Sequence, residues 1–235
     1  MSSLTGTASI ATEAAPRLQD DPDLLYLLRE FEALYRHGSA GGSPAIRSHR
    51  VREALKSGIS ENPELQNITP EIKPVTAHFG RALDLGERGP MFAMAQALRP
   101  VHRKLARVYG YDKLSKSLAR KYAYCDFFGP NGLVASDKLV LGFVLFAPNT
   151  TYPQHAHHEI EESYISIGCA WSESNNAVYA PGYLILNRSN HEHRITTGEV
   201  DPCLLAYAWT GPSERLATPG MKLSRTRRSG RRAAI

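Results

Sequence analysis

The sequence predicts a mainly β fold preceded by helices. Apolar residues recur at helical spacing in the first half, whereas after Gly129-Pro130-Asn131-Gly132 they form short runs separated by turn residues. Short strands that are joined by turns rather than by helices favour a β-sandwich or barrel. We therefore expect a disordered N-terminus at 1–20, a helical region at 21–130 that packs on the barrel, the β-barrel at 131–215 and a basic C-terminal tail at 216–235.

Helix-start and helix-stop residues divide the first half. Asp21 can cap a first helix, with Pro22 in the first turn, where its missing N–H is harmless. Glycines at 38–42 interrupt this helix. Further helices are expected from Pro44 to near Gly58, from Pro90 to Gly110 and, shorter, from Asp112 through Tyr122.

The second half contains several predicted strands. Leu139 to Phe146 is a nearly continuous apolar run, and Glu162 to Trp171 alternates with β-favouring residues. Turns are expected at 174–176 and at Pro181-Gly182. Shorter strands are expected at 183–186, 194–197 and 204–209.

Composition and charge exclude several classes of protein. The formal net charge is +5, but six of the 28 Lys and Arg residues lie in the last fourteen residues, which contain no acid. This tail has no aromatic residue to stack on bases, so nucleic acid is not an expected partner. Three widely spaced cysteines suggest neither a disulfide framework nor a cysteine zinc site. No run of about 18 apolar residues and no secretory signal are found, so we expect a cytoplasmic protein without a membrane span.

Residues 152 to 193 hold five of the nine histidines. His155 and His157 are two apart and share one face of a strand, and Glu162 and Tyr164 share a face of the next strand. His193 returns about thirty residues later. Imidazoles and a carboxylate suit divalent metals such as Fe, Mn, Zn, Ni or Co, and such a set leaves one or two positions open for catalysis. We expect a metal site at His155, His157, Glu162 and His193.

This pattern resembles the two signature motifs of the cupin superfamily. The matching residues are His155-x-His157, then Glu162, then Pro181-Gly182 and His193. The resemblance implies a double-stranded β-barrel (jelly roll) that encloses a metal held by three His and one Glu. The flanking residues, Tyr152-Pro153-Gln154, Ser163-Tyr164 and 204–211, are similar to those of the cupin-type dimethylsulfoniopropionate lyases. That resemblance implies cleavage of dimethylsulfoniopropionate to dimethyl sulfide and acrylate.

One spacing departs from the family pattern. Several relatives have three residues between the second histidine and the glutamate, whereas four separate His157 from Glu162 here. Pairing His158 with Glu162, or His157 with Glu161, would restore the shorter spacing. We prefer His157 and Glu162 because His155 and His157 face one way and Glu162 stays two residues before Tyr164. His158 and Glu161 stay as alternative ligands, and His191 is a weaker reserve.

The chemistry of the implied elimination assigns two further roles. A base must take the proton from the carbon beside the carboxylate, and Tyr164, on the face of Glu162, is the candidate if a cation lowers its pKa. The sulfonium is a permanent cation that aromatic rings attract. Tyr152, three residues before His155, is the expected substrate-binding ring, and most other aromatic residues of the barrel region are expected to pack in the core.

Two other functions use the same residues. An iron-dependent cupin dioxygenase needs the same ligand set, with oxygen at the open positions. A non-enzymatic cupin that binds a small molecule is the third hypothesis. Cupin barrels commonly pair, so a homodimer is expected.

Overall fold

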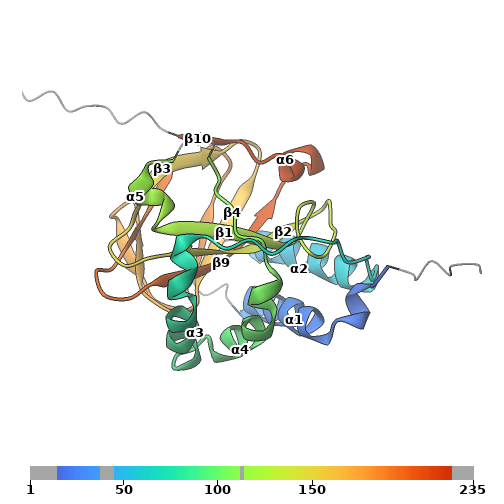
Figure 1. Ribbon diagram of the computed structural model, residues 1–235. Coiled ribbons are helices and arrows are strands. Elements are labelled where there is room, and N and C mark those ends of the chain that lie inside the picture. Colours follow the sequence, from blue (N-terminus) through green and yellow to red (C-terminus); the bar gives the residue numbers. More distant parts are fainter. Residues whose placement is uncertain (1–14, 38–44, 112–113, 224–235) are drawn as a thin grey trace, which may run out of the picture.

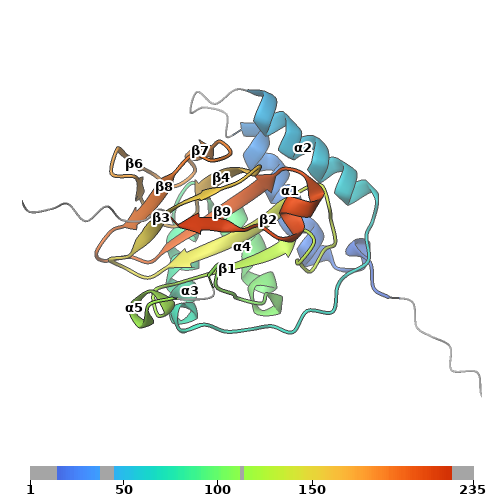
Figure 2. The ribbon, with the colours of Figure 1, turned by 90° about the horizontal axis from the view of Figure 1, so that it is seen from above.

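Two five-stranded sheets form the body of the protein (Figures 1 and 2). The computed structural model describes residues 15–37, 45–111 and 114–223. One sheet has the order β1-β2-β9-β4-β7 and the other the order β10-β3-β8-β5-β6, and every pairing is antiparallel. Side chains of both sheets share one core cluster, so the sheets face each other. This is the double-stranded β-barrel preceded by helices that the sequence predicts, and the predicted fold class is confirmed.

The bounds of the elements are as follows. The α-helices are α1 (Pro22–His37), α2 (Ala45–Ser60), α3 (Phe79–Glu87), α4 (Phe92–Val101), α5 (Lys116–Ala119) and α6 (Ser213–Ala217). Three 3-10 helices lie at Leu18–Asp20, Pro74–His78 and His102–Lys104. The strands are β1 (Tyr122–Phe128), β2 (Val140–Phe146), β3 (Thr151–His157), β4 (Glu161–Ser166), β5 (Trp171–Glu173), β6 (Ala177–Tyr179), β7 (Leu184–Asn187), β8 (His193–Thr197), β9 (Cys203–Thr210) and β10 (Met221–Leu223).

Helices α1, α3 and α4 cover the outer face of the β1-β2-β9 sheet (Figure 1). Strand β2 therefore has apolar neighbours on both sides: Phe143 packs on the helices, whereas Val144 and Phe146 point between the sheets. This double burial explains the continuous apolar run of β2, because a strand covered on one face only would alternate.

The start of α1 follows the sequence closely. Asp21 accepts a hydrogen bond from the backbone N–H of Leu24 at 3.2 Å, as expected of a capping residue. Leu18, in the segment that the sequence leaves without structure, is fully buried in a short 3-10 helix. Residues 1–14 of that segment lie outside the described residues, as do the glycines at 38–42 and the basic tail from residue 224 on.

The structure differs from the helix predictions at α4 and at α3. Helix α4 ends at Val101 rather than near Gly110, because Pro100 stands in its last turn and the chain becomes extended at Leu105. Helix α3 was not predicted, since its glycines hide its pattern. Gly86 is required there by packing: a Cβ atom would lie 2.8 Å from a methyl carbon of Ile167.

Tyr122 lies in strand β1, not at the end of a helix. The helix before it, α5, ends at Ala119, and β1 pairs with β2 along its whole length. The barrel therefore begins nine residues before the predicted boundary at 131 and continues past 215 to β10. Sequence alone does not reveal this strand, because its pairing partner β2 follows the turn residues at 129–132.

No described helix has both the length and the apolar character needed to cross a membrane.

Candidate active site

The four predicted metal ligands converge between the two sheets. His155 and His157 come from β3, Glu162 from β4 and His193 from β8. All four are buried, with at most 3% of each residue exposed. Oε2 of Glu162 lies 3.0 Å from Nε2 of His193 and 3.7 Å from Nε2 of His157. The facing strands thus bring together residues that are up to 38 positions apart in the chain.

Backbone carbonyls orient two of the imidazoles. Nδ1 of His155 lies 2.9 Å from the carbonyl oxygen of Pro153, and Nδ1 of His193 lies 3.1 Å from that of His191. A ring that donates from Nδ1 has its lone pair at Nε2, the arrangement usual for metal-binding histidines. The Nε2 atoms of both rings are therefore available to bind a ligand inside the site.

Several polar atoms of this group make no hydrogen bond within the described part of the protein, although Nε2 of His193 and Oε2 of Glu162 lie 3.0 Å apart. The described buried atoms without a hydrogen bond include Nε2 of His193, both ring nitrogens of His157 and Oε2 of Glu162. Buried polar atoms normally have partners, because desolvating them without one is costly. Ligand atoms of His155, Glu162 and His193 lie within 4.8 Å of one another, so this group can hold a metal ion. The donor set suits a transition metal.

For most of these four residues, the pKa shifts favour the protonation state in which the side chain can bind a metal. Burial, aided by His193, lowers the pKa of His155 to about 3, and burial likewise lowers the pKa of His157. Burial alone would raise the pKa of Glu162, but the surrounding imidazoles hold it well below its usual range. Glu162 also raises the pKa of His193 despite its burial. Neutral imidazoles beside an ionised carboxylate are what metal binding requires.

The alternative ligands lie elsewhere. Half of the His158 side chain is exposed, and its Nδ1 atom lies 3.1 Å from Oδ1 of Asn190. His191 is exposed, and Glu161 is half-buried beside Thr210. Glu159, with a φ angle of +59°, lies in the short turn between β3 and β4, where the spacing of His157 and Glu162 departs from the family pattern.

The two predicted functional tyrosines also face the ligands. Tyr164 is buried, and its ring centroid lies 6.0 Å from that of His193. Burial and the nearby Glu162 carboxylate raise the pKa of Tyr164 well above its usual value. The ring of Tyr152 contacts His155 edge-on, with 4.9 Å between the centroids.

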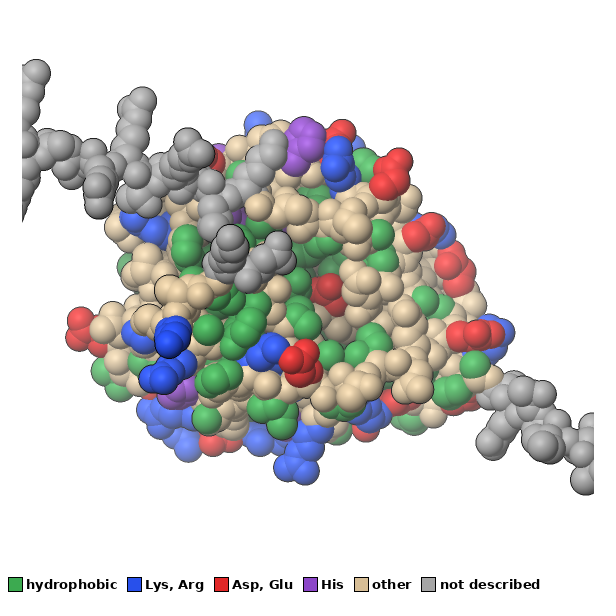
Figure 3. All heavy atoms as spheres, turned by 45° about the horizontal axis from the view of Figure 1, so that its top comes forward, with side chains coloured by type: hydrophobic (Ala, Val, Ile, Leu, Met, Phe, Trp, Pro, Cys, Tyr) green, Lys and Arg blue, Asp and Glu red, His purple; other side chains and the backbone are tan. Residues whose placement is uncertain are grey.

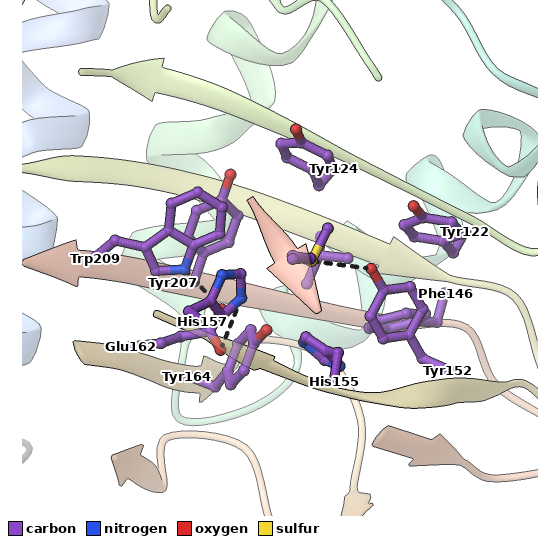
Figure 4. A pocket seen from close by; sticks show the side chains of 12 residues that line it. Tyr122, Tyr124, Phe146, Tyr152, His155, His157, Glu162, Tyr164, Tyr207 and Trp209 are labelled. Carbon is purple, nitrogen blue, oxygen red and sulfur yellow. Dashed lines mark hydrogen bonds and ion pairs between the residues drawn. The ribbon is translucent and has the colours of Figure 1, made fainter. Parts of the chain in front are cut away.

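Aromatic side chains complete the wall of a cavity beside the ligands (Figure 4). Sequence reasoning missed Tyr122 and Tyr124 of β1, Phe146 of β2 and Met221 of β10, and it left Tyr207 and Trp209 as core residues. The cavity is lined by Tyr122, Tyr124, Val144, Phe146, Tyr152, His155, His157, Glu162, Tyr164, Tyr207, Trp209 and Met221. The alternation Tyr122-Ala123-Tyr124 was a usable signal, because residues two apart share a face. On the face shown in Figure 3, apolar side chains surround a hollow near the centre.

Two other aromatic residues of the barrel region do not line this cavity. Tyr183 is 47% exposed, whereas Trp171 is buried between the sheets.

Comparison with known proteins identifies relatives along most of the chain. The family model for dimethylsulfoniopropionate lyase matches residues 47–205. A curated protein of Cereibacter sphaeroides, which bears the name "Putative dimethylsulfoniopropionate lyase DddL", is 61% identical over 215 residues. That match covers 91% of this chain and 93% of the relative.

Two solved structures share the fold. A chain from the crystal structures of the DMSP lyases RdDddP and RnDddQII superposes with a TM-score of 0.62 at 16% identity, covering 86% of this chain and 98% of that one. The crystal structure of the DMSP lyase DddQ from Ruegeria pomeroyi DSS-3 gives a TM-score of 0.55 at 22% identity, covering 81% and 92%. Both likenesses extend over the helices and the barrel together.

Proposed function

The chain belongs to the dimethylsulfoniopropionate lyase family, and we propose that it cleaves dimethylsulfoniopropionate to dimethyl sulfide and acrylate by a metal-dependent β-elimination. Family membership makes it a carbon–sulfur lyase. The observation that supports the metal-dependent mechanism is a group of buried ring nitrogens and a carboxylate oxygen, on His157, Glu162 and His193, that make no hydrogen bond with any described residue and lie beside an aromatic cavity. A cytoplasmic location and a homodimer stay predictions from the sequence.

His155, His157, Glu162 and His193 would hold the metal. Bound there, a divalent ion supplies a Lewis acid that polarises the substrate carboxylate and lowers the pKa of the neighbouring phenol. Trp209 and the backbone carbonyls of Pro153 and His191 keep the ligand side chains in orientation.

Tyr164 is the proposed base. Its phenolate oxygen takes the proton from the carbon beside the carboxylate, and the electron pair of that C–H bond forms the double bond of acrylate. The C–S bond breaks, and its electron pair leaves with sulfur as neutral dimethyl sulfide. Two features support this role: Tyr164 stands two residues from Glu162 on the same face of β4, and it is buried.

Aromatic rings hold the other end of the substrate. Tyr152, the adjacent Tyr122 and Tyr124 line the cavity, and aromatic rings attract a sulfonium by cation–π interaction. A buried apolar wall also suits the departure of a neutral thioether better than that of a charged group.

The test is release of dimethyl sulfide into the headspace, with acrylate measured by NMR in the same sample. Protein stripped with a chelator is compared with protein reloaded with Fe, Mn, Zn, Ni or Co, under air and under nitrogen. We expect equimolar products that depend on the added metal and not on oxygen. If no reloaded sample releases gas above a heat-denatured control, the proposal is wrong; a requirement for oxygen would favour a dioxygenase.

A further inference from the structure

Strand β10 lies beside β3, the strand that carries the candidate ligands His155 and His157. It is the edge strand of its sheet and pairs with β3, so that Met221 stands opposite His157 and Leu223 opposite His155. The preceding helix α6 is anchored by Leu216, which is 1% exposed. Between this anchor and β10 the chain passes through exposed Gly220, where an added Cβ would meet no atom within 4 Å.

The side chain of Met221 enters the cavity. The hydroxyl of Tyr152 donates to its sulfur atom at 3.7 Å, and Met221 lines the cavity together with the aromatic rings. Gly110 leaves room for the end of the side chain, because a Cβ atom at that position would overlap the terminal methyl group of Met221. Tyr152 and Gly110, which are distant from Met221 in the sequence, thus lie against its side chain.

This side chain fills the space that a substrate needs. The cavity that remains has a volume of about 20 Å³, which is room for about one water molecule. A sulfonium carboxylate is several times larger. Met221 carries a methyl thioether, the same group that the proposed reaction releases, and it lies among the rings proposed to bind the sulfonium.

We propose that β10 is a strap that must move for substrate to bind, and that the Met221 thioether holds the place of the sulfonium group until it is displaced. This inference rests on the proposed function. Met221 then sets the affinity for sulfonium carboxylates, because each substrate molecule must first displace it.

The length and the pairing of β10 allow it to separate from the sheet. It has three residues, and within the described part of the chain its sheet partner is β3. When it leaves, its backbone groups can bond to water at the sheet edge. The aromatic rings attract a full positive charge more strongly than they attract a neutral thioether, so a sulfonium displaces Met221.

The first experiment measures binding without turnover. The probe is (trimethylammonio)acetate, a quaternary ammonium carboxylate that has no β carbon and so cannot be eliminated, titrated calorimetrically into metal-loaded protein. We expect Met221→Ala to bind the probe about tenfold more tightly than the wild type, because a competing apolar side chain is gone. Met221→Leu, which keeps the volume, should stay within about threefold of the wild type. Unchanged or weaker binding by Met221→Ala would show that the side chain is a wall of the site and would overturn the proposal.

The second experiment fastens the strap. Lys222 and Ala156 are opposite each other in the β10–β3 register. Directly opposed positions of antiparallel strands are within the Cα separation that a disulfide spans. Oxidation of the double variant Lys222→Cys, Ala156→Cys should weaken probe binding at least about tenfold, and reduction with a phosphine should restore it; each single variant is the control. Full binding by the oxidised double variant would overturn the proposal.

The experiments distinguish failure of the proposal for β10 from failure of the proposed lyase function. If the wild type releases dimethyl sulfide but either the Met221→Ala variant or the disulfide variant gives the contrary result stated above, the proposal for β10 is wrong and the proposed lyase function stands. If the wild type releases no dimethyl sulfide, the proposed function fails whatever the probe shows.

Discussion

Trp209 donates its indole N–H to Oε1 of Glu162 at 2.6 Å, inside the barrel. The two residues are directly opposite in the pairing of β9 with β4. This bond occupies one carboxylate oxygen and leaves Oε2 toward His193 and His157. Trp209 therefore determines which oxygen of Glu162 is available to a metal.

Trp209→Phe should weaken metal binding by roughly 10- to 100-fold, the usual effect of losing a group that orients a ligand. Competition with a chromogenic chelator measures it. Trp171→Phe is the matched control, because Trp171 is buried in the same barrel and its indole nitrogen has no hydrogen-bond partner among the described residues. Equal affinity of the two variants would contradict the orienting role.

The adjacent histidines His157 and His158 provide a test of the ligand set. His157→Gln should lower metal affinity by more than the roughly 100-fold lost with an orienting group, since a ligand itself is removed. His158→Gln should bind metal like the wild type, because that side chain is half exposed and outside the cluster. Metal content per chain after dialysis is the measurement. The reverse result would assign the ligand to His158.

Tyr164→Phe should lower kcat by roughly 10²- to 10⁴-fold, the usual contribution of a general base. The bound metal should be retained, since Phe preserves the packing beside His193. Tyr183→Phe, at an exposed ring outside the cavity, should retain wild-type kcat. Initial rates of acrylate formation measure both variants. An active, metal-loaded Tyr164→Phe enzyme would require another base.

Ionisation of Asp126 should make the folded protein less stable above pH 6 than at pH 4. Burial raises the pKa of this carboxyl to about 6, and Tyr207 donates a hydrogen bond to it. Between about pH 4 and pH 6 the folded state holds a proton that the unfolded chain releases, so the free energy of unfolding falls as pH rises through this range. Asp126→Asn keeps an acceptor for Tyr207 and removes the charge from this half-buried position.

We expect Asp126→Asn to raise the free energy of unfolding by about 1 to 3 kcal/mol at pH 8 and to change it little at pH 4. Denaturant titrations of metal-free protein at the two pH values measure the difference. Asp137→Asn, at an exposed position, should show no such dependence. A gain for Asp126→Asn at pH 4 that equals the gain at pH 8 would rule out the buried charge as its cause.

The local sequence pattern was sufficient to predict many of the helices and strands. Asp21 and Pro22 define the start of α1, and the apolar run of β2 reflects a strand buried on both faces. The two-residue period of β3 and β4 places His155 with His157, and Glu162 with Tyr164, before any contact is known. Helix α3 and strand β1 were missed because packing and pairing, not propensity, decide them.

The sequence by itself determined the fold class, the family and the residues that converge on the site, because strand periodicity and motif spacing are local properties. Only the tertiary structure shows that His157 is buried 3.7 Å from Glu162 whereas the His158 side chain is half exposed. It also brought Trp209 to Glu162 and Met221 into the cavity. Those contacts depend on the pairing of distant strands, and no local pattern encodes which strands meet.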